Sequence, residues 1–186
     1  MLSDVDILHA RDLLELDIYP WNDEQLQPAS YDLTLKDTFL IHIPQPASLE
    51  RSIDVSMLGN LPTWTTIRTQ VYDLSPGQLV LGCTRESVTL SRALAGKIEG
   101  RSSLGRVGLM VHVTAGFVDP GWQGQLTLEM FNLAPWPIAL RAGMGISQMG
   151  FHRLDTPSEH VYGDETLKNR YADNPSGPVG ARPRLG

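Results

Sequence analysis

The chain is 186 residues long, carries a net charge of −6 at pH 7, and contains 41% hydrophobic and 19% charged residues. This composition is ordinary for a globular protein with a core of its own. Two classes of protein are excluded. A protein that binds long nucleic acids is one, because an acidic chain without a block of Lys and Arg would repel them. A protein with a membrane-spanning helix is the other, because no apolar run reaches the roughly 18 residues that such a helix needs.

The N-terminal stretch predicts a helix over about residues 4 to 15, because Ser3 and Asp6 have the spacing of a capping box. The apolar side of this helix would be formed by Ile7, Leu8, Leu13 and Leu14. The same stretch is rich in acids and lacks the basic start and apolar core of a signal peptide. We therefore expect a cytoplasmic protein.

The rest of the chain predicts many short strands. They are YDLTL (31–35), TFLIHI (38–43), QLVLGCT (78–84), LMVHVT (109–114), QLTLEMF (125–131), PIAL (137–140) and ISQMGF (146–151). Turn signals separate them at Pro76-Gly77, Pro120-Gly121 and Ala142-Gly143. This pattern predicts an all-β fold, a distorted β-barrel or jelly roll, within one domain over residues 1–186.

Two regions show no regular pattern. Residues 44 to 70 predict a long irregular excursion. From about residue 156 to residue 186 the chain is rich in Gly, Pro and polar residues, so it could not build a core alone. This tail could be plainly disordered, or it could be a lid that orders over a ligand.

Cysteine and histidine usage limits the metal chemistry. Cys83 is the single cysteine, which excludes an internal disulfide and any multi-cysteine metal site. The histidines, which show no spacing typical of a metal site, are His9, His42, His112, His152 and His160. We expect them to be structural or exposed, with His112 as a strand residue.

The stretch GRSSLGRVG (100–108) has the composition of a phosphate cradle. Its glycines let backbone amides approach a ligand, Ser102 and Ser103 can donate hydrogen bonds, and Arg101 and Arg106 can pair with phosphate oxygens. It is not a Walker sequence. The alternative is a Gly/Ser turn with solvated arginines.

The stretch TAGFVDPGWQG (114–124) places Asp119 directly before a Pro-Gly turn. Aspartate at such a position commonly caps the backbone. The alternative is a carboxylate at the rim of a pocket, where it could bind a sugar hydroxyl or a water molecule.

Glu129 stands in the most hydrophobic predicted strand, directly before Met130 and Phe131. It could be paired with an arginine such as Arg101 or Arg106. A desolvated carboxylate, however, has its pKa raised towards neutrality, as a general acid/base requires. We therefore interpret Glu129 as a catalytic acid/base.

Together these stretches resemble the dCTP deaminase branch of the dUTPase-like superfamily. The similarity is most specific in GRSSLGRVGLMVHVTAGFVDPGWQGQLTLEMFN (100–132). Weaker support comes from QPASYDLTL (27–35), AGMGISQM (142–149) and PSEHVYG (157–163). The resemblance implies a homotrimer of distorted β-barrels, with active sites between neighbouring subunits and a C-terminal lid.

The resemblance also implies deamination of dCTP without zinc. Zinc deaminases need His and Cys ligands in an H-x-E and C-x-x-C arrangement, which a chain with one cysteine cannot supply. By similarity, Glu129 takes the proton from the water that attacks C4 of cytosine. Ser102 and the carbonyl of Ala115 hold that water, and Arg106 fixes the geometry around Glu129.

The nucleotide-binding residues implied by the resemblance are Arg101, Ser102, Ser103, Leu104, Gly105, Arg106, Asp119, Thr127, Leu128, Glu129, Gln148, Tyr162, Arg170 and Asn174. Thr127 and Leu128 would line the base through their backbones. In the tail, Arg170 and Asn174 stand where the family has Lys and Gln. Mg²⁺ would be held by the triphosphate, dUTP would bind as well, and dTTP would act as feedback inhibitor.

The product is open between dUTP and dUMP. TAGFVDPG resembles the bifunctional, dUMP-forming members, whose reaction supplies precursor for dTTP. A small Gly116 would leave room for a second water, activated by Asp119, although the glycine could equally serve a turn. The sequence also leaves open a plain dUTPase and a catalytically silent nucleotide-binding trimer. Glu129 and the poor match of NPSGPVGARPR to a dUTPase tail count against the plain dUTPase.

Overall fold

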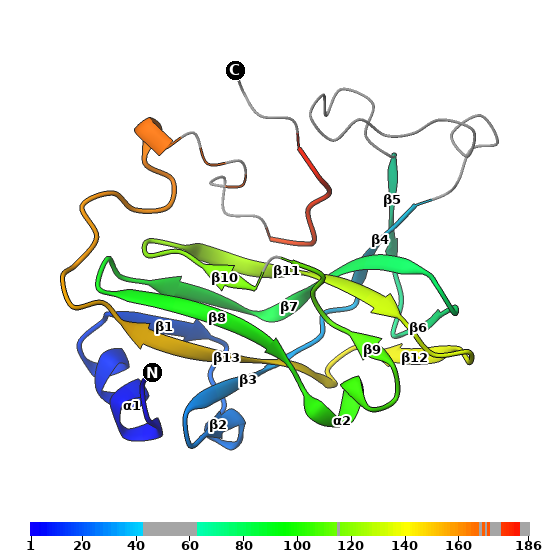
Figure 1. Cartoon of the computed structure of the whole chain (residues 1–186), viewed down its shortest axis with the longest axis horizontal. Helices are drawn as coiled ribbons and strands as arrows, with labels where there is room; N and C mark the ends of the chain where they lie inside the picture. Colours follow the sequence, from blue (N-terminus) through cyan, green and yellow to red (C-terminus); the bar gives the residue numbers. More distant parts are fainter. Residues whose placement is uncertain (43–62, 115, 168, 170, 172–175, 183–186) are drawn as a thin grey trace.

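A computed structural model describes residues 1–42, 63–114, 116–167, 169, 171 and 176–182. The predicted all-β class is confirmed (Figure 1). The helical elements are α1 (Asp4–Asp12), η1 (Asp23–Gln25), α2 (Ser102–Gly105) and η4 (Glu165–Leu167). The strands are β1 (Leu16–Tyr19), β2 (Leu26–Gln27), β3 (Ser30–Thr34), β4 (Thr38–His42), β5 (Trp64–Arg68), β6 (Val71–Leu74), β7 (Leu79–Leu90), β8 (Leu94–Gly100), β9 (Leu109–Met110), β10 (Phe117–Val118), β11 (Gln123–Asn132), β12 (Ile138–Arg141) and β13 (Gly145–Arg153).

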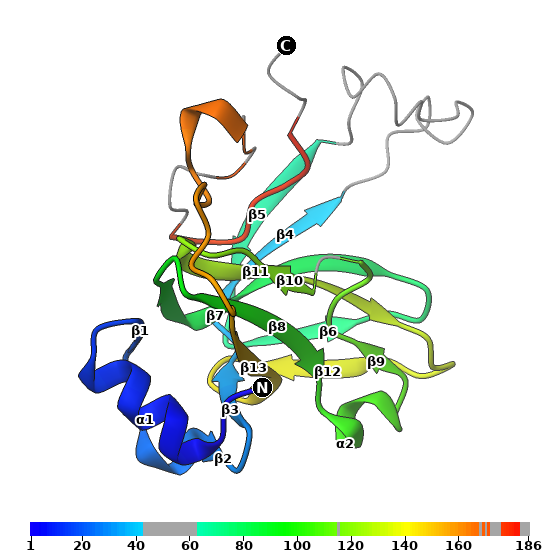
Figure 2. The same cartoon turned by 60° about the vertical axis from the view of Figure 1, so that its left-hand side comes forward.

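Two antiparallel sheets enclose a common core. One sheet has the order β5-β4-β7-β11-β9, with β1 also paired to β7, and the other has the order β10-β8-β13-β3-β2. A small third sheet pairs β12 with β6. The buried apolar cluster takes side chains from both large sheets, for example Val80 and Leu128 from one and Ile98 and Phe151 from the other. The long strands β7 and β11 form the centre of the first sheet (Figures 1 and 2).

The N-terminal helix starts as predicted but ends earlier. The capping box between Ser3 and Asp6 is confirmed. The helix stops at Asp12 rather than residue 15, because Leu14 adopts a left-handed conformation with φ of 57° and turns the chain into β1. The predicted apolar side is wrong in part: Ile7 and Ala10 are buried, whereas Leu8, Leu13 and Leu14 are exposed.

The strand predictions differ from the structure in several places, and β1, β2, β6 and β10 are among the strands that were not predicted. The prediction of one strand over residues 109–114 is wrong, since β9 ends at Met110 and the chain continues as a loop that crosses between the two sheets. The excursion over 44–70 contains β5 and is therefore not wholly irregular; residues 43–62 lie outside the described part. Strand β8 is not predicted, because alanine, lysine and two glycines weaken its pattern.

The predicted turns are confirmed by the backbone of their glycines. Gly77, Gly121 and Gly143 have φ values of 71°, 83° and 82°, a conformation that other residues adopt only with strain. Each of these glycines lies between two strands. The Pro120-Gly121 turn in particular joins β10 to β11, the two strands that frame the site described below.

Two buried polar groups differ sharply in chemistry. Cys83 is fully buried, and burial raises the pKa of its thiol to about 12, which disfavours the reactive thiolate. Glu86 is 1% exposed, yet its carboxylate accepts hydrogen bonds from the amide and hydroxyl of Thr34 and from Gln25. Glu86 therefore ties β7 to β3 and η1. Among the described helices, none has the length and apolarity to cross a membrane.

Candidate active site

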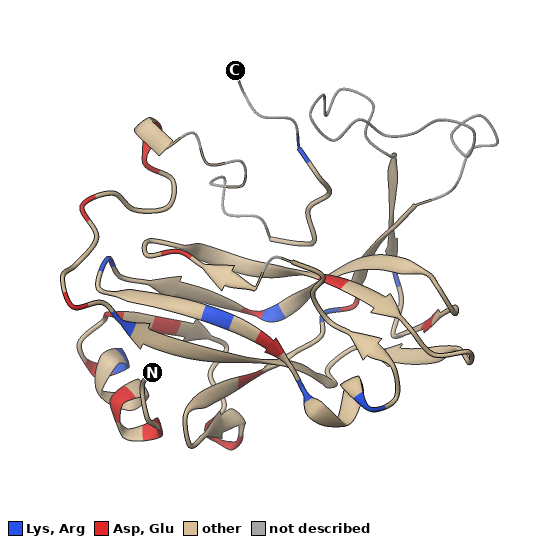
Figure 3. Cartoon of the chain, viewed as in Figure 1, with Lys and Arg blue, Asp and Glu red and all other residues tan. Residues whose placement is uncertain are grey.

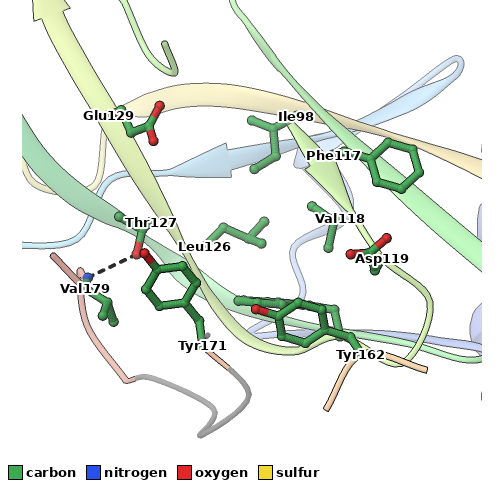
Figure 4. A pocket seen from close by; sticks show the side chains of 11 residues that line it. Ile98, Phe117, Val118, Asp119, Leu126, Thr127, Glu129, Tyr162, Tyr171 and Val179 are labelled. Atoms are coloured by element: carbon green, nitrogen blue, oxygen red, sulfur yellow. Dashed lines mark hydrogen bonds between the residues drawn. The ribbon is translucent and has the colours of Figure 1, made fainter. Parts of the chain in front are cut away.

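A pocket lies against the polar face of β11, between the two large sheets and the C-terminal segment (Figure 4). Its volume is about 190 Å³. The residues that line it are Ile98, Phe117, Val118, Asp119, Trp122, Leu126, Thr127, Glu129, Tyr162, Tyr171 and Val179. Ligand pockets commonly measure about 300–1,000 Å³, so this cavity is large enough for only part of a nucleotide.

Glu129 is held at the pocket by two backbone amides. Its Oε2 accepts hydrogen bonds from the amide of Val113 at 2.9 Å and from the amide of Thr114 at 3.1 Å. Strand β11 alternates buried and half-buried residues, and Glu129 lies on the half-buried side with Thr127. Because both contacts are made by one oxygen, the other oxygen is left for a ligand or a water at the pocket.

The alternative interpretation of Glu129 as a salt-bridge partner is not what the chain adopts. Arg101 pairs instead with Asp32, with 3.4 Å between Nη2 and Oδ2. Arg106 is exposed at the C-terminal end of α2. Among the described residues, Glu129 forms no ion pair within its own chain.

A β-bulge shapes the floor of the pocket. The register between β11 and β7 shifts between Gln125 and Thr127, and the amide of Leu126 donates to the hydroxyl of Thr84 rather than to a backbone carbonyl. Bulges of this kind redirect side chains and are frequent beside active sites. Here the bulge brings both Leu126 and Thr127 to the pocket, while Leu128 points into the core.

Asp119 lies at the rim of the same pocket and is exposed. Within the described part of the chain its carboxylate accepts no hydrogen bond, so the interpretation as a backbone cap is not supported. The turn after it also anchors the tail. The amide of Tyr162 donates to the carbonyl of Pro120 at 2.7 Å, and the ring of Tyr162 lies 5.1 Å from that of Trp122.

The C-terminal segment crosses β11 and closes one side of the pocket. The amide of Val179 donates to the hydroxyl of Thr127 at 3.1 Å, and Nζ of Lys36 donates to the carbonyl of Ser176 at 2.8 Å. Tyr171 adds an aromatic wall, visible beside Thr127 in Figure 4. We call residues 176–182 the strap.

Gly116 packs closely against its neighbours, and it has no positive φ that would require a glycine for a turn. It is buried, and a methyl group at this position would lie 3.1 Å from both Cε1 of His112 and the carbonyl oxygen of Ile98. The prediction of His112 as a strand residue is wrong, because it lies in the loop before Gly116. Its Nδ1 is buried without a described hydrogen-bond partner, and its Nε2 is 4.0 Å from Glu99.

The predicted residues fall into two groups. Asp119, Thr127, Glu129 and Tyr162 meet at the pocket. The described residues 101–106 do not line it: α2 lies beyond the end of β8, below β10 and β11 in Figures 1 and 2. Gln148 is likewise outside the pocket, on β13. Ala115, Arg170 and Asn174 lie outside the described residues.

The second group is marked by its charge. Arg101 and Arg106 stand at the two ends of α2, which carries a basic position on each side in Figure 3. Ser102 and Ser103 are exposed between them. This is the arrangement expected of an exposed anion-binding loop, and the carboxylates of the pocket do not lie against it in the same chain.

Sequence reasoning missed seven of the pocket residues: Ile98, Phe117, Val118, Trp122, Leu126, Tyr171 and Val179. Four of them lie inside the stretch 114–131, which also contains Asp119 and Glu129. Their closeness in sequence to these two candidate residues could have indicated that they line the same pocket. Ile98 comes from a strand that was not predicted. Tyr171 and Val179 come from a tail without periodicity.

The fold and the two clusters of polar groups describe an all-β protein with a pocket lined by two carboxylates. A crystal structure of 2′-deoxycytidine 5′-triphosphate deaminase from Agrobacterium tumefaciens has the same fold, with a TM-score of 0.62 at 23% identity. The match covers 82% of this chain and 47% of that one, so this chain spans about half the length of that structure.

Residues 1–154 match the model of the dCTP deaminase-like family, and the chain belongs to that family. A protein of Tropheryma whipplei strain Twist, named dCTP deaminase, dUMP-forming, is 42% identical over 172 residues, which cover 92% of this chain and 87% of that protein. A protein of the same name from Bifidobacterium animalis subsp. lactis strain AD011 is 40% identical over 191 residues, covering 98% and 93%.

Proposed function

We propose that the protein is a hydrolase that deaminates dCTP and continues to dUMP and pyrophosphate. The observation that carries the proposal is the pair of backbone hydrogen bonds that fix Glu129 at a pocket shared with Asp119. The names of the relatives at about 40% identity support the same reaction and the same product.

In the deamination step, Glu129 is the acid/base. It takes a proton from a water molecule as the water oxygen attacks C4 of cytosine, and it delivers that proton to the ring nitrogen N3. A second proton transfer through Glu129 to the amino group lets the C4–N bond break, so that ammonia leaves and a uracil ring remains. The amides of Val113 and Thr114 hold the carboxylate in place throughout. Such preorganisation raises the rate, because the acid/base need not be reoriented during the reaction.

In the second step, Asp119 activates a water that attacks the α-phosphate of dUTP, releasing pyrophosphate and leaving dUMP. Its free carboxylate at the pocket rim supports this role, as it would also support a hydrogen bond to the 3′-hydroxyl of the sugar. Thr127 and Leu128 offer backbone groups to the base. Gly116 packs closely against His112 and Ile98, so its small size serves the loop that holds Glu129 rather than only leaving space for a second water.

The complete site requires a second copy of the chain. The pocket holds Asp119 and Glu129 but lacks the cationic loop, whereas the arginines and serines at α2 lie outside the pocket. We propose a homotrimer in which α2 of one subunit faces the pocket of its neighbour. Ser102 and the carbonyl of Ala115 would then hold the attacking water, Arg106 would orient Glu129, and Arg101 with the loop to Gly105 would bind phosphates.

Mg²⁺ is expected to arrive with the triphosphate, whose charge it would neutralise. Among the described residues, no group of three His, Cys, Asp or Glu side chains could hold a metal. The tail, from Tyr162 through Arg170 and Asn174 to the strap, is proposed as the lid, and dTTP as an inhibitor that shares the site.

The direct test of this mechanism is Glu129→Gln. Because the amide cannot take the proton from water, ammonia release from dCTP should fall by about 10²- to 10⁴-fold, while hydrolysis of added dUTP continues. The matched control is Glu24→Gln, which makes the same change at an exposed glutamate of η1, outside the pocket. Unchanged ammonia release by the Glu129→Gln protein would refute the mechanism.

A further inference from the structure

Arg101 does not lie freely on the surface. Its guanidinium reaches from the start of α2 across β13 to Asp32 on β3, where Nη2 and Oδ2 are 3.4 Å apart. The side chain of Asp32 is 15% exposed and that of Arg101 is 38% exposed. Among the described residues, Asp32 is the ion-pair partner of Arg101, so the outer donors of the guanidinium remain for a ligand.

Gly145 on β13 leaves room for the side chain of Arg101 to reach Asp32. A methyl group on its Cα would overlap Nη1 of Arg101 and would lie 3.2 Å from Cζ. No positive φ requires glycine here, since Gly145 is not among the glycines with that conformation. The glycine is explained by the guanidinium that lies over it.

The sheet register places a second predicted ligand residue beside Asp32. In the antiparallel pairing Gln148 is opposite Asp32 on β3 and opposite Glu99 on β8. Directly opposite residues project from the same face of a sheet. Gln148 therefore projects from the same face of the sheet as Asp32, the carboxylate that pairs with Arg101.

The carboxylate of Asp32 is stabilised in its charged form by the guanidinium of Arg101. Burial raises the pKa of Asp32, and the charge of Arg101 opposes that rise. A partly buried carboxylate that lost its guanidinium partner would be poorly solvated, and the guanidinium would lose its fixed position. The pair therefore fixes the geometry of both side chains, whatever its net contribution to folding.

We propose that Asp32 and Gly145 are positioning residues for Arg101, holding its guanidinium so that the outer donors face the phosphates of a nucleotide. This inference rests on the proposed function, in which that nucleotide occupies the pocket of the neighbouring subunit. It also gives a physical reason for the motifs YDL (31–33) and GMGISQ (143–148), which the catalytic residues alone leave unexplained.

The test measures the dissociation constant of dCTP with Mg²⁺ by titration calorimetry, in a Glu129→Gln background where dCTP is not consumed. Asp32→Asn and Gly145→Ala should each raise it about tenfold, which corresponds to about 1.4 kcal/mol. Gly145→Ala is expected to fold, because the group that must move is the far end of a flexible side chain. The control is Glu15→Gln, which breaks the exposed pair with Arg153 and should change nothing.

A double-mutant cycle separates positioning from general damage. In an Arg101→Gln background, neither Asp32→Asn nor Gly145→Ala should weaken dCTP binding further, because both act through Arg101. Dissociation constants within twofold of the parent, or a full additional effect in the Arg101→Gln background, would overturn the proposal.

The unmodified protein, with Glu129 in place, is assayed alongside for ammonia release from dCTP. Ammonia with unchanged dissociation constants would reject the positioning role and leave the proposed function standing. No ammonia, with dissociation constants that rise as expected, would reject the proposed function and leave the positioning role. No dCTP binding by the parent would reject both.

Discussion

At the scale of single residues, the site depends on how one carboxylate is oriented. A glutamate on the half-buried face of a strand could point along or away from the sheet, but two amides of the loop after β9 fix Oε2 of Glu129. That loop is in turn packed by Gly116 against His112. Because both backbone donors bind Oε2, the other oxygen of the carboxylate remains available for proton transfer.

Asp119→Asn separates the two reactions. The amide cannot activate water for attack on phosphorus, but it keeps the size and hydrogen-bonding of the side chain at the rim. Incubation with dCTP should therefore yield ammonia and accumulating dUTP instead of dUMP, resolved by ion-exchange chromatography. Formation of dUMP at the parent's rate would show that Asp119 is not the base for the second step.

Glu86→Ala tests the buried carboxylate that links β7 to β3. Its removal leaves the amide of Thr34 and the side chain of Gln25 without this partner, so the free energy of unfolding should fall by about 3 kcal/mol. Denaturant unfolding would measure the change. Asp17→Ala, at an exposed position of the neighbouring strand β1, is the control and should stay within about 0.5 kcal/mol.

At the scale of elements, β11 carries the site and the strap covers it. The bulge in β11 brings Leu126 and Thr127 to the pocket, and the amide of Val179 in the strap donates to the hydroxyl of Thr127. Lys36 holds the strap through the carbonyl of Ser176 while also donating to Gln125. One lysine thus links the tail to the strand that it covers.

Lys36→Met should loosen the strap without touching the reacting atoms. The loss of a hydrogen bond worth about 1 kcal/mol predicts a rise in KM for dCTP of about fivefold with little change in kcat. Steady-state kinetics would measure both constants. Arg141→Met, an exposed cation on β12, is the control. A fall in kcat with unchanged KM would show that Lys36 acts on the chemistry instead.

Strands with strict alternation or β-rich composition were predictable from sequence, as β4 and β11 show. Strand β8 was not, since its glycines and its lysine remove the pattern. Residues 111–114 were mispredicted, because an apolar loop has the same composition as a strand. The helix end was misplaced because a leucine in the left-handed conformation has no sequence signal. Local sequence patterns indicate which residues favour a strand or a helix, but they do not indicate how the chain runs between the two sheets.

The site shows the same limit. Asp119, Thr127, Glu129 and Tyr162 were predicted and do meet at one pocket. The ion pair between Arg101 and Asp32 could not be predicted from sequence, because the two residues are far apart in the chain and only the pairing of β3, β13 and β8 brings them together.

At the scale of the whole molecule, the two groups of polar residues do not meet within one chain. The pocket lies near β10, β11 and the tail, whereas α2 lies beyond the end of β8 (Figure 2). A ring of three copies would bring the basic loop of each subunit to the pocket of the next, and such head-to-tail contacts close into rings. The assembly, rather than the fold alone, would then create the enzyme.

Mixing two inactive variants tests this arrangement. Glu129→Gln and Arg106→Ala subunits, co-expressed in equal amounts, should recover about a quarter of the parental deamination rate, because a shared site is intact when each neighbour supplies its unmodified half. Each variant expressed alone is the control. A mixture no more active than the two variants separately would place both residues in a site within one chain.

The product balance from dCTP tests the proposed reaction as a whole. The parent protein is incubated with dCTP and Mg²⁺, ammonia is assayed, and dCTP, dUTP and dUMP are resolved by ion-exchange chromatography. We expect ammonia and dUMP in equal amounts with little dUTP. If no ammonia forms while added dUTP is hydrolysed, the protein is a dUTPase and the role assigned to Glu129 is wrong.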